Sequence, residues 1–142
     1  MITFVGNGVS RGPRPEPADF AAIKAEFATV LSLEGADEDV KEILELQPVR
    51  IISRPISPWQ IYVTGISQEA LAAILQFIEV EPKPLLVHCQ HGQDRTGLVI
   101  AAYRVAVCKW PKQVAMAEAL SFGYRKLINF GLNKTWEKFN GS

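Results

Sequence analysis

Residues 85–97 read Leu-Leu-Val-His-Cys-Gln-His-Gly-Gln-Asp-Arg-Thr-Gly, and this stretch decides the fold expected around it. The apolar run that begins at Leu85 is typical of a short buried strand. A tight loop follows, and from Arg95 onward the sequence becomes apolar over a length that suits a buried helix. A strand, a loop and a helix start in direct succession therefore place the thiol of Cys89 and the guanidinium of Arg95 around a ring of backbone N–H groups.

This loop contains the groups needed to hold a phosphate dianion against a sulfur nucleophile. Helix N-termini and nearby cations lower the pKa of a cysteine thiol, and the free N–H groups of a helix start bind anions. Arg95 offers a planar fork for two phosphate oxygens, and Gly92 permits a sharp turn or a close ligand. Thr96 is expected to donate its hydroxyl to the sulfur of Cys89. Cys89, Arg95 and Thr96 are therefore the predicted catalytic residues.

The stretch resembles the His-Cys-x5-Arg-Thr signature of the cysteine-dependent protein tyrosine phosphatase superfamily. Residues 10–15 (Ser-Arg-Gly-Pro-Arg-Pro) are similar to the first loop of its small, dual-specificity-like bacterial members, and the likeness covers most of residues 4–139. The resemblance implies a phosphatase that acts on protein phosphotyrosine or phosphoserine/threonine through a phosphocysteine intermediate on Cys89, without metal or cofactor. It also implies that the substrate is bound by Gln90, His91, Gly92, Gln93, Asp94 and Arg95. His88 is expected to support the loop through hydrogen bonds.

The general acid has no candidate in its usual place for this superfamily. Family members commonly carry an Asp on a loop upstream of the cysteine, but residues 53–60 contain no Asp, Glu or His. Asp94 is the expected replacement, because some branches, such as the myotubularins, also carry an Asp directly before the Arg. Repulsion from a bound phosphate dianion would raise the pKa of Asp94, which suits an acid. The alternative is that Asp94 hydrogen-bonds the loop or pairs with a cation; the outside candidates for the acid are Asp37, Asp39 and Glu69.

Other residues are expected around the pocket. Gln90, His91 and Gln93 are predicted to point from the loop and to tune substrate choice. Trp59 either caps the pocket or lies at the edge of the core. The candidates for a basic rim, each of which also suits an ordinary surface charge, are Arg11, Arg14, Arg54, Arg125 and Lys126.

The composition is that of a globular protein without a strong charge bias. Fifteen basic and fifteen acidic residues among 142 cancel, so we expect no nucleic-acid or membrane partner, and a monomer is favoured. The sequence shows neither a signal peptide nor an apolar run long enough to span a bilayer, which predicts a cytoplasmic location. Two cysteines are too few for a disulfide framework. Cys108 is predicted to fill space in the core, and a reversible disulfide with Cys89 is left open.

Strands and helices alternate along the chain. The predicted strands cover residues 2–5, 29–33, 49–52 and 85–88, and residues 6–15 are predicted to form a loop. Helices are predicted at 17–27, 40–46, from Ser67 to about 78, 96–107, 111–122 and 129–139. This alternation predicts one α/β domain over residues 1–142, with a central, mostly parallel sheet of four to five strands and helices on both faces. Ligands of such sheets bind beyond the carboxyl ends of the strands, where Cys89 is expected.

Two other functions stay open at the level of the sequence. An inositol-phosphate or phosphoinositide phosphatase would use the same chemistry on a different substrate. A phosphate-binding pseudophosphatase is favoured by the missing upstream Asp, whereas the complete set of Cys89, Arg95 and Thr96 argues against it.

Overall fold

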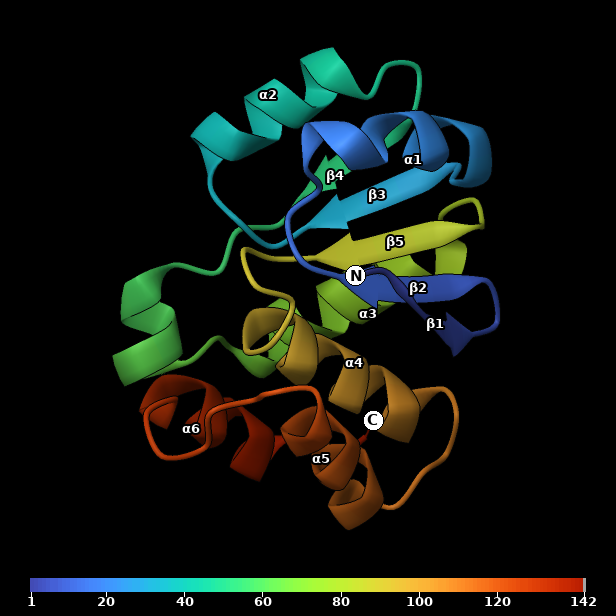
Figure 1. The fold of residues 1–142 in the computed structure, drawn as a ribbon. Helices are drawn as coiled ribbons and strands as arrows, with labels where there is room; N and C mark the ends of the chain where they lie inside the picture. Colours follow the sequence, from blue (N-terminus) through green and yellow to red (C-terminus); the bar gives the residue numbers. More distant parts are fainter. Residues whose placement is uncertain (142) are drawn as a thin grey trace.

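Five strands form one sheet in the order β1-β2-β5-β3-β4 in the computed structural model, which describes residues 1–141 except the side chain of Ala36 (Figure 1). Strands β2, β5, β3 and β4 run parallel, and β1 is antiparallel to β2 at the edge. The predicted α/β fold with a mostly parallel sheet is therefore confirmed. The strands are β1 (Thr3–Gly6), β2 (Val9–Gly12), β3 (Thr29–Ser32), β4 (Arg50–Ser53) and β5 (Leu85–His88).

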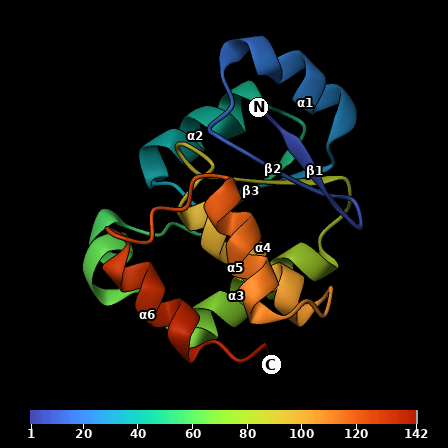
Figure 2. The same ribbon diagram turned by 60° about the horizontal axis from the view of Figure 1, so that its bottom comes forward.

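Helices cover both faces of the sheet. One face is covered by α1 and α2, and the other by the larger group from α3 to α6, as Figures 1 and 2 show. No helix within residues 1–141 is long and apolar enough to cross a membrane. The helices are η1 (Pro17–Asp19), α1 (Phe20–Glu26), α2 (Ala36–Glu45), η2 (Gln60–Thr64), α3 (Gln68–Val80), α4 (Arg95–Ala106), α5 (Lys112–Ser121) and α6 (Phe130–Lys138).

Successive residues of the central strands enter two different cores. Leu85 and Val87 of β5 pack in the large core with α3, α4 and α5, whereas Leu86 packs with Ile23 of α1 on the opposite face. Because side chains alternate along a strand, a strand covered on both sides is apolar throughout. Burial of every residue of β5 explains why the apolar run at Leu85 predicted its boundaries correctly.

Helix α4 is the centre of the larger helical layer. Eight consecutive residues, from Thr96 to Tyr103, are buried. A helix that is apolar on all sides is a core helix, so the prediction for this segment is confirmed. Its N-terminus points into the loop that follows β5, which positions the site.

Two elements differ from the sequence-based prediction. Residues 9–12 form the interior strand β2, although Gly, Pro and Arg residues predicted a loop from 6 to 15. The segment forms a strand because its backbone pairs with β5 on one side and with β1 on the other. Its pairing with β5 runs from Val9 opposite Leu85 to Gly12 opposite His88. Residues 60–64 form a π-helical turn, η2, which packs along α6.

Candidate active site

Cys89 directly follows the carboxyl end of β5, and the loop that it begins leads into α4. The cysteine is 2% exposed. Asp94 precedes the first helical residue, and its carbonyl accepts the amide of Leu98 at 3.0 Å. The free amides at this helix start therefore face the loop, as the sequence predicts, and create an anion-binding environment beside the thiol.

A pocket of about 210 Å³ contains the predicted nucleophile and the predicted anion clamp together. The loop contributes most of its lining, and the remaining wall comes from η2 and from the connection between α5 and α6. The lining residues are Ile61, Tyr62, Cys89, Gln90, His91, Asp94, Arg95 and Arg125.

Arg95 is held in place by backbone carbonyls beyond two other strands. Its Nη1 donates to the carbonyl of Ile56 at 3.1 Å and to that of Leu33 at 3.4 Å. These bonds use one corner of the planar guanidinium, so its other N–H groups remain for a phosphate. The ends of the parallel strands thus orient the cation on which the candidate chemistry depends.

The segment that leaves β2 supports the loop from one side. The amide of Arg14 donates to the carbonyl of Gln90 at 3.1 Å. Gly92 has φ +72°, and a Cβ there would lie 2.7 Å from the carbonyl carbon of Gly12. Glycine at this position is therefore required by both conformation and space, and the loop seats directly on the end of β2.

Asp94 binds the connection between α5 and α6 on the other side of the loop. Its Oδ1 accepts hydrogen bonds from the backbone amide of Arg125 at 3.0 Å and from Asn129 Nδ2 at 2.7 Å. Its Oδ2 accepts hydrogen bonds from Nε and Nη2 of Arg125 at 3.0 and 2.6 Å. Both oxygens of the carboxylate are thus fully occupied by donors. Of the two roles considered for Asp94, pairing with a cation is the one that the geometry displays.

These contacts also act on the pKa of Asp94. Burial raises the pKa of this carboxyl, but the hydrogen bonds from Arg125 and Asn129 outweigh burial and hold it below its ordinary value of 3.8. The sequence predicts a raised pKa for Asp94 because it shows only the repulsion from a bound phosphate dianion. Arg125 and Asn129, which lower this pKa, lie 31 and 35 residues further along the chain. The local motif therefore gives no sign of them.

Two loop residues lie differently from expectation. Gln93 packs against Gly123, where an added Cβ would lie 2.8 Å from its Nε2, and it does not line the pocket. The hydroxyl of Thr96 is buried without a hydrogen-bond partner among the described residues, so the expected bond to the sulfur of Cys89 is not formed. The predicted contact of Gln93 with a substrate therefore stays a prediction, while its position against Gly123 ties the loop to the segment after α5.

The rim candidates divide into residues that reach the pocket and residues that do not. Arg125 lines it. Arg14 instead pairs with Glu34 at 2.5 Å, Arg54 stacks on Phe77 at 4.4 Å, and Arg11 is buried. Trp59 and Lys126 are not among the lining residues. Among the outside candidates for the acid, Asp39 is buried and accepts hydrogen bonds from Ser32 and Ser53.

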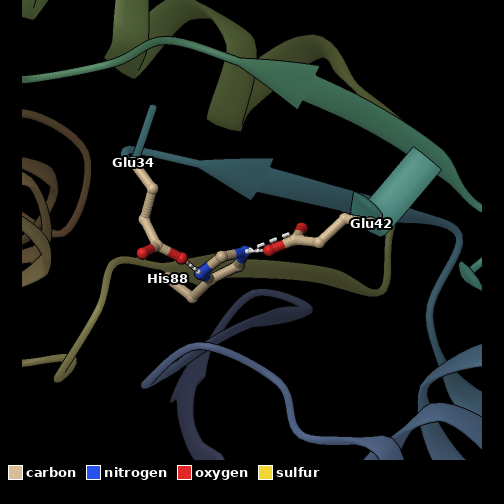
Figure 3. A group of neighbouring side chains, drawn as sticks. All are labelled: Glu34, Glu42 and His88. Atoms are coloured by element: carbon tan, nitrogen blue, oxygen red, sulfur yellow. Dashed lines mark hydrogen bonds and ion pairs between the residues drawn. The ribbon is translucent and has the colours of Figure 1, made fainter. Parts of the chain in front are cut away.

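His88 lies between two buried carboxylates (Figure 3). Its Nε2 donates to Glu42 Oε2 at 2.9 Å, and its Nδ1 is 3.4 Å from both Glu34 Oε2 and the carbonyl of Cys89. The imidazole thus joins the backbone of the nucleophile to α2 and to the end of β3. This arrangement agrees with the predicted supporting role.

The same three side chains have the spacing of metal ligands. One donor atom each from Glu34, Glu42 and His88 lies within 4.8 Å of the others. Each ring nitrogen of His88 already faces a carboxylate oxygen, and Glu34 is also bonded by Arg14. The hydrogen bond between His88 and Glu42 and those from Arg14 to Glu34 therefore account for the cluster, and the absence of a metal in the reaction stays a prediction.

Removing Glu42 tests this support. We expect Glu42→Ala to lower the free energy of unfolding by about 2–3 kcal/mol, because it leaves a buried imidazole N–H without an acceptor. Urea denaturation followed by circular dichroism measures the change. Glu45→Ala, on the exposed side of α2, is the control and should change stability by less than about 0.5 kcal/mol. Equal stability of the two variants would contradict the support role.

Cys108 cannot reach the nucleophile. The twelve residues of α4 separate the two cysteines, with Cys89 before its start and Cys108 after its end. Such a helix is about 18 Å long, whereas a disulfide needs Cα atoms within about 7 Å. The disulfide left open by the sequence is therefore ruled out by the position of α4.

Sequence reasoning missed the contacts of Asn129 and the burial of Arg11. Arg125 is a rim candidate that does line the pocket, Asn129 is only a helix boundary in the sequence, and Arg11, a candidate for the rim or for an ordinary surface charge, is buried. Asn129 is fully buried in the structure. In the sequence, an Asn before a helix does not point to a functional site, because Asn is common at helix starts. No local pattern indicates that these residues meet Asp94 or the loop.

Known proteins resemble this chain over most of its length. The sequence model of the tyrosine phosphatase family matches residues 3–138. The dual specificity protein phosphatase TpbA of Pseudomonas aeruginosa is 35% identical over 102 residues, which are 71% of this chain and 44% of TpbA. The inositol diphosphatase DSP4 of Arabidopsis thaliana is 26% identical over 107 residues, 72% of this chain and 54% of DSP4. The chain spans about half the length of these curated relatives.

Solved structures share the fold. The crystal structure of P. aeruginosa TpbA has a TM-score of 0.78 at 23% identity, covering 99% of this chain and 91% of that chain. The core catalytic domain of the PP-IP phosphatase SIW14 from S. cerevisiae has a TM-score of 0.77 at 19% identity, covering 98% and 85%. Since the family model extends over residues 3–138, from the first strand to the last helix, the chain belongs to the tyrosine phosphatase family.

Proposed function

We propose that this protein is a phosphatase that hydrolyses phosphomonoesters of proteins, phosphotyrosine or phosphoserine/threonine, with Cys89 as nucleophile. The observation that carries the proposal is the pocket in which Cys89 and Arg95 lie together at the start of α4. A thiol, a guanidinium and a helix N-terminus around one small cavity form a site for a phosphate dianion. The relatives support this reading, since TpbA is named a dual specificity protein phosphatase and one of its structures contains pTyr.

In the first step, the thiolate of Cys89 attacks phosphorus opposite the ester oxygen. The S–P bond forms as the P–O bond breaks, and the electron pair of that bond goes to the leaving oxygen, which takes up a proton from solvent water. Arg95 and the loop amides stabilise the charge on the three equatorial oxygens. Gly92 lets the backbone approach the phosphate closely, and Gln90 and His91 contact the substrate at the pocket mouth.

In the second step, water attacks the phosphocysteine. The S–P bond breaks, its electrons return to sulfur as thiolate, and the proton of the water passes to solvent while phosphate leaves. The hydroxyl of Thr96, which lacks a partner among the described residues, is available to stabilise the departing sulfur.

Asp94 acts in this proposal as an ionised anchor for Arg125. Four donors occupy its carboxylate, and its pKa is lowered. A proton donor at neutral pH needs the opposite shift. Asp94 thereby holds Arg125 at the pocket wall, and the acid role expected from the motif becomes the alternative to be tested.

The variant Asp94→Asn separates these roles. We expect kcat to fall by a similar factor, within about threefold, for p-nitrophenyl phosphate and for phenyl phosphate, whose leaving group is much poorer. We also expect the variant to be about 1–2 kcal/mol less stable at pH 7. Because the folded pKa lies below 3.8, this loss should persist above about pH 5 and shrink as the pH falls through the folded pKa.

Glu45→Gln, on the exposed side of α2, is the control and should match the wild type. A fall of about 10²-fold confined to phenyl phosphate, together with loss of the basic limb of the pH–rate profile, would establish Asp94 as the acid. That outcome would overturn the anchor role.

The test of the proposed function is turnover of a generic aryl phosphate. We expect the purified protein to release p-nitrophenol from p-nitrophenyl phosphate, to be inhibited by vanadate and to keep its rate in excess EDTA. A protein that binds vanadate but shows no turnover is the phosphate-binding pseudophosphatase. Turnover that disappears with EDTA would replace the cysteine mechanism by metal catalysis.

Inositol phosphates are the second candidate substrates. The observation in favour is that Arg125 and His91 line the same pocket as Cys89, where they can face additional phosphate groups. Relatives named inositol diphosphatase DSP4 and PP-IP phosphatase SIW14 add to it. A panel that compares kcat/KM on phosphotyrosine peptides, phosphoserine peptides and inositol pyrophosphates decides between the classes. A ratio above about tenfold for the inositol pyrophosphates would make them the favoured substrates.

The remaining sequence-based predictions belong to this proposal. They are a single domain, a monomeric state, a cytoplasmic location, no cofactor, and no nucleic-acid or membrane partner. Size-exclusion chromatography with light scattering tests the monomer.

A further inference from the structure

Arg11 is a buried arginine beneath the loop of the site. It lies on β2, opposite Val87 of β5, and is 2% exposed. Arginine is almost never fully buried unless another charge pairs with it. The burial of Arg11 in the sheet beside the candidate nucleophile loop therefore calls for a specific role.

The contacts of Arg11 are made with the loop and with an aromatic ring. Its Nη2 donates to the carbonyl of Gly92 at 2.9 Å, and its Cζ lies 4.2 Å from the ring centre of Phe122. Its Nη1 is buried and has no hydrogen-bond partner among the described residues. The guanidinium thus contacts a carbonyl with one edge and an aromatic ring with one face, and within residues 1–141 no carboxylate forms a hydrogen bond with it.

The charges around Arg11 leave an excess of positive charge below the loop. Burial lowers the pKa of Arg11, whereas Glu118 and Cys89 act in the opposite direction and Arg104 adds to the lowering. Glu118 already receives two hydrogen bonds of 3.0 Å from Arg104. Two guanidinium groups therefore share one carboxylate, and the remaining positive charge favours an anion at the loop.

The bond to Gly92 also orients a peptide group. In a planar trans peptide, the C=O of one residue and the N–H of the next point in opposite directions. Since Arg11 holds the carbonyl of Gly92 from the side of β2, the amide of Gln93 points away from β2. An amide turned in this way is one of the donors that an anion-binding loop requires.

We propose that Arg11 is a positioning residue for the phosphate loop, which holds the Gly92–Gln93 peptide in its anion-binding orientation and supplies a buried positive charge that favours the thiolate of Cys89. The contribution to turnover rests on the proposed phosphatase function. The contribution to the thiolate does not, because the reactivity of Cys89 can be measured without any substrate.

Alkylation of Cys89 by iodoacetamide, read by peptide mass spectrometry so that Cys108 is scored separately, tests the charge. For Arg11→Met we expect the rate at about pH 6 to fall about tenfold while the rate at about pH 9 stays within twofold, because the thiolate is the reacting form. For Arg11→Lys, which keeps the charge, we expect alkylation at about pH 6 within about threefold of wild type. The other charged groups of the pocket, His91, Asp94, Arg95 and Arg125, are unchanged in both variants.

Turnover of p-nitrophenyl phosphate tests the peptide orientation. We expect kcat to fall at least about tenfold in Arg11→Met and at least about fivefold in Arg11→Lys, since an ammonium lacks the fork that reaches Gly92 while stacking on Phe122. Arg54→Met is the matched control. Arg54 also stacks on an aromatic ring, Phe77 at 4.4 Å, but its hydrogen bond goes to the carbonyl of Ser53 and it does not line the pocket, so both readouts should stay near wild type.

The outcomes are distinguishable. If Cys89 of Arg11→Met is alkylated at the wild-type rate at both pH values, the charge role is overturned. If Arg11→Lys hydrolyses p-nitrophenyl phosphate at the wild-type rate, the orientation role is overturned. If Arg11→Met fails to fold by circular dichroism, Arg11→Lys carries the test through the expected contrast between near-normal alkylation and reduced turnover. A wild-type protein without turnover refutes the proposed function, while the alkylation contrast still decides the charge role.

Discussion

Replacing Cys89 by serine will reduce the hydrolysis of p-nitrophenyl phosphate by about 10⁴-fold or more. A serine hydroxyl stays protonated at neutral pH, so neither the helix start nor Arg95 can turn it into an anionic nucleophile as they can a thiol. The substitution is nearly isosteric at a site that is 2% exposed, and we expect the stability to change by less than about 1 kcal/mol. Initial rates and thermal unfolding measure the two effects.

Cys108→Ser is the control, because Cys108 lies beyond the opposite end of α4. It should retain the wild-type rate and its response to vanadate. Substantial activity in Cys89→Ser, with the protein folded, would refute nucleophilic catalysis by Cys89. A complementary measurement is mass spectrometry after acid quench, which should find phosphate on the peptide that contains Cys89 in the wild type.

Replacing Arg95 by lysine will lower kcat/KM by about 10³-fold even though the positive charge is retained. The guanidinium is oriented by the carbonyls of Leu33 and Ile56 at 3.4 and 3.1 Å. A lysine cannot donate to these carbonyls and to two phosphate oxygens at once, because its ammonium is a compact point charge. Steady-state kinetics on p-nitrophenyl phosphate give the loss of transition-state stabilisation directly.

Arg125→Lys is the matched substitution at another arginine of the same pocket. Since Arg125 is occupied by Asp94 at 2.6 Å, we expect a much smaller loss, about tenfold or less. Similar losses in the two variants would mean that Arg95 has no special role in clamping the phosphate. A tenth of the wild-type activity surviving in Arg95→Lys would lead to the same conclusion.

Most of the features that the sequence predicted correctly depend on residues near one another in the chain. The strand from Leu85 to His88, the buried helix after Arg95 and the pairing of Cys89 with Arg95 follow from a contiguous stretch. Their geometry is local, because a strand end and a helix start separated by six residues can only form a tight loop. The periodic helices and the alternation that gives a parallel sheet follow from the same local patterns.

Tertiary structure alone decided the surroundings of the loop. Arg11 contacts a carbonyl 81 residues away, and Asp94 binds a side chain 31 residues away. The composition of residues 9–12 predicted a loop, but pairing with two neighbouring strands makes them an interior strand and buries Arg11. The sequence by itself therefore indicated the candidate nucleophile and the candidate anion clamp, whereas the fold decided which charges surround them, because burial and charge pairing depend on segments that meet only after folding.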